Sequence, residues 1–227
     1  MQNPPAFYYI TVATKPHQVL NKIIETVNQN EDESIMVLGQ QENRFIGWEG
    51  NQNFGVKLRE VADFLKRPDL DANDIVLFTD AYDVAYLGKK ANVIARYLTF
   101  IKPIVFGSER CCNPDPHLAG QYPYQDNEFP FLNSGMFIGR VWALRKCLED
   151  YQYDDRHDDQ RYWTDQFLNK HGDLIELDYE NKLFLNTVDI DMRFFYQLKQ
   201  NMVTYKNRNP LFVHVNGPDK RMILNFL

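Results

Sequence analysis

Short apolar runs alternate with longer amphipathic segments through the first 107 residues, and this alternation restricts the fold more than any other feature of the chain. In the first amphipathic segment, Val19, Ile23 and Val27 recur at the spacing of one helix face. Strands that alternate with helices form a parallel sheet with helices on both faces. The expected strands of this half are 7–14, 34–38, 75–78 and 104–106, and the expected helices are 16–28, 56–65 and 92–100.

The second half of the chain is less regular. Pro114, Pro116 and Pro123 predict a long loop over residues 108–129. After this loop we expect strands at 132–139, 174–177, 183–186 and 211–215, and helices at 141–150 and 158–170. A chain of 227 residues is long enough for one large domain. We therefore predict a single α/β domain with a mostly parallel central sheet, a loop-rich C-terminal half, and ligands bound beyond the carboxyl ends of the strands.

Charge and composition exclude several classes of protein. The net charge is −6 and no run of Lys or Arg occurs, which argues against a nucleic-acid partner. No apolar segment approaches the ~20 residues that span a bilayer, so no membrane span is expected. The first residues, Met1–Pro5, lack the basic and apolar regions of a signal peptide. The default expectation is a cytoplasmic protein, unless a targeting segment lies outside this sequence. No GxGxxG or P-loop motif is present.

Two carboxylates follow the apolar run Ile75–Phe78. In a continuous strand the side chains of Asp80 and Asp83 would point to opposite faces. Both can bind one ligand if the chain leaves the strand at Asp80 and turns. Carboxylate oxygens suit Mg²⁺ or Mn²⁺, metals that commonly carry a diphosphate. The alternative interpretation is an acidic turn after a strand, where Asp is common without any ligand.

Polar side chains open the expected strand at 132–139. Asn133 and Ser134 precede a permissive Gly135, and they could bind a sugar or simply form the entry of a hairpin. Glu109 follows another strand, where it is either a solvated loop charge or a polar group on the acceptor side.

An acidic run precedes the expected helix at 158–170. Asp154 and Asp155 are typical of solvated surface. Asp158 and Asp159 stand at the helix start, where one of them could cap the helix.

The segment Asn209–Lys220 places a histidine in a buried strand before a turn. A lone His214 in a strand is commonly a core residue. Asn216, Gly217 and Lys220 behind it favour a different interpretation, in which a metal ligand is followed by a phosphate-binding turn with exposed amides and an ammonium group.

These motifs occur in the order TVAT, VLG, TDAYD, GSE, FLNSGMFIG, DDQ and HVNGP. In this series the chain resembles the GT-A fold (Rossmann-like) glycosyltransferases, most closely the glycosyltransferase domain of the lysyl hydroxylase/collagen glucosyltransferase proteins. The resemblance runs from Ile10 to Lys220. It implies a nucleotide-binding half at about 1–107 and an acceptor- and sugar-binding half at about 108–227. It also implies that Mn²⁺ is bound by Asp80, Asp83 and His214. The nucleotide is then contacted by Val12, Thr14, Lys57 and Tyr82, and the sugar by Asn133, Asp158 and Asp159. The diphosphate is contacted by Asn216, Gly217 and Lys220.

The resemblance implies transfer of glucose or galactose from a UDP-sugar with retention at the anomeric carbon. The catalytic candidates are Asp159, Asp158 and Glu109, and the sequence does not choose among them. The acceptor is a hydroxyl of a protein or glycan, with hydroxylysine or galactosyl-hydroxylysine of a collagen-like protein as the family's example. Two alternatives remain open, a non-catalytic UDP- or metal-binding module of the same fold and a metal-dependent nucleotide phosphohydrolase.

Two positions depart from the family pattern on the acceptor side. The family has a tryptophan where this chain has Asn113. It has a second tryptophan near the position of Arg44, for which Trp48 could substitute.

Overall fold

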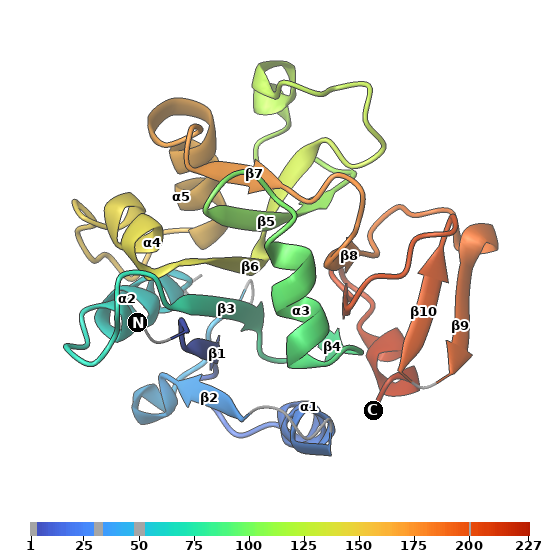
Figure 1. The fold of residues 1–227 in the computed structure, drawn as a ribbon, viewed down its shortest axis with the longest axis horizontal. Coiled ribbons are helices and arrows are strands. Elements are labelled where there is room, and N and C mark those ends of the chain that lie inside the picture. The colour runs from blue at the N-terminus through green and yellow to red at the C-terminus, as the bar shows by residue number, and fades with distance from the viewer. Residues whose placement is uncertain (1–3, 30–33, 48–52, 200) are drawn as a thin grey trace.

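A computed structural model describes residues 4–29, 34–47, 53–199 and 201–227. The chain forms a six-stranded central sheet with the strand order β2-β1-β3-β6-β5-β7 (Figure 1). β1 pairs in parallel with β2 and β3, and β5 pairs in parallel with β7, whereas β6 runs antiparallel to both β3 and β5. The predicted mostly parallel sheet is therefore confirmed. The strands are β1 (Phe7–Val12), β2 (Ile35–Leu38), β3 (Ile75–Asp80), β5 (Ile104–Glu109), β6 (Phe131–Arg140) and β7 (Ile175–Leu177).

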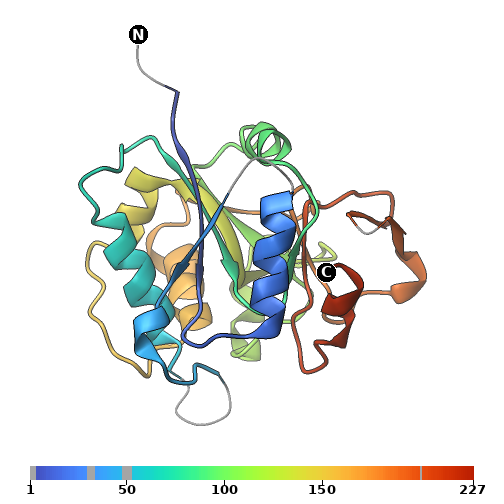
Figure 2. The ribbon, with the colours of Figure 1, turned by 90° about the horizontal axis from the view of Figure 1, so that it is seen from below.

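Helices cover both faces of the sheet, as the sequence predicted. The helices are α1 (Gln18–Gln29), α2 (Gly55–Leu65), α3 (Lys90–Tyr97), α4 (Val141–Cys147) and α5 (Asp159–Asp165). In β3, Val76 and Phe78 join a core with α2, α4 and α5, and Ile75 and Leu77 join a second core with α1 and α3. Figure 2 shows α2 and α5 on one side of the strands and α1 on the other. Because both faces are buried, the strands are continuous apolar runs rather than alternating ones.

Three of the expected α-helices end earlier than the sequence indicated, and the one expected over 92–100 ends at Tyr97. The segment predicted as a helix over 141–150 stops at Cys147. The segment predicted over 158–170 is an α-helix only to Asp165 and then widens into a π-helix over Gln166–Lys170. Short 3₁₀ turns occur at Gln40–Glu42, Pro116–Gln121, Met192–Phe194 and Arg221–Asn225. The expected loop at 108–129 begins later than predicted, because β5 continues to Glu109.

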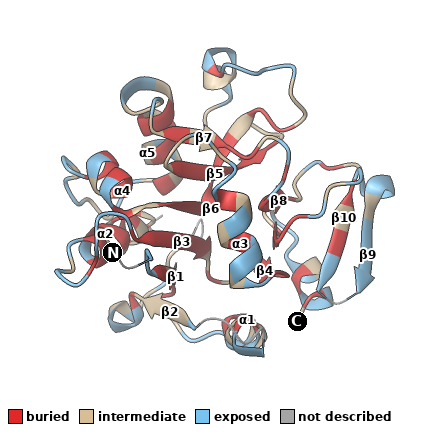
Figure 3. Cartoon of the chain, in the orientation of Figure 1, coloured by how far each residue is buried: buried red, intermediate tan, exposed pale blue. Residues whose placement is uncertain are grey.

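A second, three-stranded sheet packs beside α3 (Figure 1). In it β11 (Phe212–His214) lies between β4 (Val84–Tyr86) and β8 (Phe184–Asn186), antiparallel to the former and parallel to the latter. A hairpin of β9 (Phe195–Lys199) and β10 (Met202–Tyr205) packs against this sheet through Val203 and Tyr205, and its β9 strand is largely exposed (Figure 3). The sequence did not predict β4, β9 or β10. β4 has only three residues, and β9 lacks the half-buried alternation that marks a strand.

The helices of the described segments are too short or too polar to cross a membrane.

Candidate functional site

A cavity of about 720 Å³ opens at the carboxyl ends of β1 and β3 and beside the C-terminal segment. Every candidate residue named from the sequence lines it. These residues are Val12, Thr14, Lys57, Asp80, Tyr82, Asp83, Glu109, Asn133, Asp158, Asp159, His214, Asn216, Gly217 and Lys220. Positions separated by up to 208 residues in sequence are thus brought to one cavity by the central sheet and by β11.

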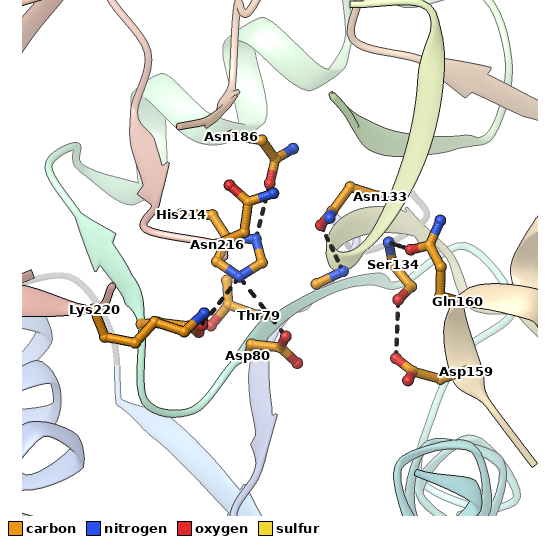
Figure 4. Close-up of polar contacts among 12 residues, drawn as sticks. Thr79, Asp80, Asn133, Ser134, Asp159, Gln160, Asn186, His214, Asn216 and Lys220 are labelled. Carbon is orange, nitrogen blue, oxygen red and sulfur yellow. Dashed lines mark hydrogen bonds and ion pairs between the residues drawn. The ribbon is translucent and has the colours of Figure 1, made fainter. Parts of the chain in front are cut away.

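Asp80, Asp83 and His214 form a cluster in which one ligand atom of each lies within 4.8 Å of the others. Asp80 is the last residue of β3, the chain bends over the next three residues, and β4 begins at Val84. This bend brings Asp83 to the same side as Asp80, as two carboxylates acting on one ligand require. β4 pairs with β11, and this places His214 Nε2 3.3 Å from Asp83 Oδ2 and 3.8 Å from Asp80 Oδ2 (Figure 4).

Asp83 and His214 are buried, Asp80 is half-buried, and compensating charges lie beside them. Burial by itself opposes ionisation of Asp83, yet the neighbouring His214 and Lys220 hold its pKa well below the ordinary value. The Lys220 ammonium forms an ion pair with Asp83, so a cation already lies beside these carboxylates. Two carboxylates and one imidazole are a donor set that fits Mg²⁺ or Mn²⁺.

The space for the His214 ring depends on Gly135, the third residue of the Asn133–Gly135 motif. A Cβ at Gly135 would lie 2.4 Å from His214 Cε1 and 2.9 Å from Asp80 Oδ2. Both distances are shorter than any van der Waals contact, so a side chain here would displace two members of the cluster. From the sequence, Gly135 was interpreted only as a permissive position. Its steric role depends on the approach of β11, which the sequence pattern does not reveal.

Lys57 connects the cluster to Asp159. Its Nζ lies 2.7 Å from Asp80 Oδ1 and 3.1 Å from Asp159 Oδ2. Burial by itself would lower the pKa of Lys57, but the charges of Asp159 and Asp80 raise it above the ordinary value. Asp159 is buried as well and accepts a hydrogen bond from Ser134 Oγ at 2.9 Å (Figure 4). Its pKa is raised by burial against the opposing effect of Lys57.

The helix cap is provided by Asp158 and not by Asp159. The Asp158 carboxylate accepts the N–H of Arg161 at 3.1 Å, and α5 begins at the next residue. The Asp159 carboxylate therefore does not cap the helix, and it contacts Lys57 and Ser134 instead. Asp154 and Asp155 pair with Arg side chains outside the cavity lining, consistent with the surface interpretation of that acidic pair.

Glu109 lies between two asparagine side chains at the end of β5. Its Oε1 accepts a hydrogen bond from Asn133 Nδ2 at 2.9 Å, and its Oε2 accepts one from Asn216 Nδ2 at 3.0 Å. The residue is only 4% exposed, and burial raises the pKa of its carboxyl group to about 7. Glu109 is thus a buried carboxyl group at the cavity and not a solvated loop charge.

The turn after β11 is held by Asn216. Its Oδ1 accepts the backbone N–H groups of Thr187 at 2.9 Å and Val188 at 3.0 Å. Gly217 has a φ of +96°, in the left-handed region, and a Cβ there would lie 2.7 Å from a methyl group of Val188. The Asn216 carboxamide therefore orders the turn, and glycine is the residue that fits the following position.

Tyr82 also lines the cavity, with Val12 at the end of β1 and Thr14 just after it. Tyr82 donates its hydroxyl proton to the carbonyl of Lys15 at 3.0 Å, and its ring lies 5.1 Å from that of His17. The cavity also has an apolar lining that the sequence did not predict, from Ile46, Phe54, Pro114, Val188 and Pro218. Trp48, named as a substitute for a family tryptophan, lies outside the described residues.

Comparison with known proteins agrees with this arrangement. Residues 3–227 match the model of a family described as the PLOD GT domain. The chain belongs to this glycosyltransferase domain family. It is 32% identical over 239 residues to the multifunctional procollagen lysine hydroxylase and glycosyltransferase of Caenorhabditis elegans, covering 98% of this chain and 32% of that protein. The human protein of the same description, LH3, is 27% identical over 242 residues, covering 99% of this chain and 31% of that protein.

The PLOD GT domain chain described here thus spans about a third of the length of these curated relatives. Among solved structures, it is similar to a glycosyltransferase involved in the glycosylation of the major capsid of PBCV-1. The TM-score is 0.50 at 12% identity, and the match covers 98% of this chain and 100% of the other. This likeness supports the GT-A fold predicted from the motif series.

Proposed function

We propose that this domain is a Mn²⁺-dependent, retaining hexosyltransferase that takes glucose or galactose from a UDP-sugar. The Asp80–Asp83–His214 cluster carries the proposal, because its three ligand atoms are close enough to share one cation inside a cavity lined by the residues named for the nucleotide and the sugar. A bound divalent cation supplies positive charge to the leaving diphosphate. Oxygen ligands with one imidazole favour Mn²⁺ over Zn²⁺.

The residues around the cluster fit the parts of a UDP-sugar. Tyr82, Val12 and Thr14 form the end suited to a pyrimidine ring. Lys220 pairs with Asp83, and with the turn at Gly217 it lines the same cavity, where an ammonium and backbone amides can hold phosphate oxygens as negative charge develops on them.

Sugar binding and catalysis are assigned to the buried polar groups beside the cluster. Asp159 has a carboxylate that Lys57 and Ser134 hold in place, which suits a group that stabilises positive charge on the sugar. Glu109, with its raised pKa, is the proposed proton acceptor for the incoming hydroxyl. Asp158 is engaged as the helix cap, and this makes it the weakest of the three catalytic candidates.

For the acceptor we propose a protein or glycan hydroxyl, with hydroxylysine or galactosyl-hydroxylysine of a collagen-like protein as the first to test. The names of the curated relatives, which include procollagen, support this choice. Asn113 and Pro114 line the cavity near Glu109 and form the proposed acceptor side. The tryptophan that the family has at the position of Asn113 is absent here, so a different glycan acceptor is the main competing outcome.

A donor screen tests the proposal. UDP release is measured for the common UDP-sugars with Mn²⁺, with EDTA, and with galactosyl-hydroxylysine peptides as acceptor. We expect release only with Mn²⁺ and fastest with UDP-glucose or UDP-galactose. Binding of UDP without any turnover would identify a non-catalytic module instead. Cleavage of UDP itself to UMP and phosphate would identify a phosphohydrolase.

A further inference from the structure

Asn186 is a fully buried residue that contacts His214 but is not itself one of the three proposed metal ligands. It ends β8 and lies beside His214, the last residue of β11, in the register of the three-stranded sheet. Its Oδ1 is 2.8 Å from His214 Nδ1 (Figure 4). Its Nδ2 donates a hydrogen bond to the carbonyl oxygen of Ser108 at 3.0 Å. The two contacts hold the Asn186 carboxamide between β5 and the imidazole.

These contacts determine where the imidazole proton resides. The Ser108 carbonyl can only accept, so the amide nitrogen of Asn186 must face it and the amide oxygen must face His214. That oxygen also can only accept, so Nδ1 of His214 carries the hydrogen. A neutral imidazole has a single N–H, and the lone pair is therefore on Nε2. Nε2 is the atom that lies 3.3 Å from Asp83 Oδ2.

We propose that Asn186 is a positioning residue that fixes the tautomer and orientation of His214 and thereby prepares Nε2 to bind a divalent cation. The inference rests on the proposed metal site. Partners of this kind typically change metal affinity by about 10–100-fold when removed. Gly107 helps to place the Asn186 side chain, because a Cβ at this position would lie 3.1 Å from Asn186 Nδ2 and crowd the amide. The bulge of β5 between Phe106 and Gly107 thus leaves room for the Asn186 side chain.

The first test measures Mn²⁺ binding to the protein without nucleotide, from the loss of the free Mn²⁺ electron paramagnetic resonance signal. Asn186→Leu keeps a similar volume and removes the acceptor, and we expect about 10–100-fold weaker binding. Asn186→Asp restores an acceptor for Nδ1–H when its second carboxyl oxygen is protonated and donates to the Ser108 carbonyl, and we expect affinity within a few-fold of the unaltered protein. Tyr97→Phe is the matched control, because Tyr97 is also buried and donates to a backbone carbonyl, that of Pro103, at 2.7 Å.

The second test needs no metal. Nitrogen-15 NMR of the metal-free protein, followed upward in pH until His214 is neutral, reports which nitrogen of each neutral histidine carries the proton, and His214→Gln identifies the His214 signals. We expect the Nδ1–H form in the unaltered protein and in Asn186→Asp, and a mixture or the Nε2–H form in Asn186→Leu. If the unaltered protein does not bind Mn²⁺, the proposed metal site fails, while the tautomer measurement still decides the role of Asn186.

An unchanged His214 tautomer together with unchanged Mn²⁺ affinity in Asn186→Leu would overturn the proposal. If that variant does not fold, Gly107→Ala takes its place, since its methyl group presses on the same amide. In Gly107→Ala we expect Mn²⁺ affinity and the His214 tautomer to change in the same direction as in Asn186→Leu, but by less. Unaltered tautomer and affinity in Gly107→Ala would then overturn the proposal equally.

Discussion

Lys57 Nζ lies 3.1 Å from Asp159 Oδ2, although 102 positions separate the two residues in the sequence. The ion pair joins α2 to the start of α5 across the cavity. Lys57 also contacts Asp80 at 2.7 Å, so one buried ammonium pairs with a carboxylate of the proposed metal site and with a carboxylate of the proposed sugar site. The position of Asp159 is therefore linked to that of the cluster.

Asp159→Asn tests whether that carboxylate acts on the sugar. The substitution keeps the size of the side chain, and Lys57 retains Asp80 as a partner, so folding and UDP affinity should survive. If the charge stabilises a cationic sugar in the transition state, kcat should fall by about 10²-fold or more. Single-turnover kinetics and UDP calorimetry measure the two effects separately. Asp165→Asn, at an exposed end of α5, is the control and should keep full activity. Full turnover in Asp159→Asn would leave Glu109 as the remaining candidate.

Lys220 is predicted to compete with a metal for Asp83 before nucleotide binds. Lys220→Met removes the ammonium that pairs with Asp83, so Mn²⁺ alone should bind more tightly. UDP should bind more weakly, by about 10-fold, because a charge-assisted contact to phosphate is lost. Calorimetry with Mn²⁺ and then with UDP measures both changes. Arg221→Gln is the matched control, since Arg221 is 88% exposed in its side chain and pairs with Asp219. Parallel losses of Mn²⁺ and UDP affinity would contradict the competition.

Gly135→Ala should disable the cation site without altering any ligand. The added methyl group would overlap His214 Cε1 and Asp80 Oδ2, so one of the two must move. We expect Mn²⁺ affinity to fall at least 10-fold and activity to fall with it. Gly120→Ala controls for the loss of a glycine, because a Cβ at that position meets nothing within 4 Å. Normal Mn²⁺ binding in Gly135→Ala would show that the ring has room to shift.

The sequence predicted the parts of the site whose signal is local. Asp80, Glu109 and His214 each end a strand whose apolar residues are visible in the sequence, and these strands were expected near their observed positions. Asn186 ends such a strand as well, and the same rule applied to the expected strand at 183–186 would have selected it.

Other features depend on contacts between distant segments and leave no local pattern. The steric requirement at Gly135 arises because β11 lies against β6 at the cluster. The three-residue strand β4 forms only because β11 pairs with it. Likewise, the sequence does not show which of the adjacent Asp158 and Asp159 caps the helix. The choice depends on where α5 begins, and the structure places the cap at Asp158.

Glu109 should control the pH dependence of transfer. Burial raises the pKa of its carboxyl group to about 7, so the group loses its proton as the pH rises through neutrality. A proton acceptor works only in the ionised form, and kcat/KM measured with saturating Mn²⁺ should therefore rise between about pH 6 and pH 8 and then level off.

Glu109→Gln cannot titrate. Its rate should be lower by about 10²–10⁴-fold, the usual contribution of such a group, and flat across the same range. Both oxygens of Glu109 accept from asparagine side chains, so the variant also disturbs Asn133 or Asn216, and UDP affinity is measured beside the rate to separate the two effects. If the variant keeps the same slope of rate against pH, another group accepts the proton, and Asp159, whose pKa burial also raises, becomes the one to test.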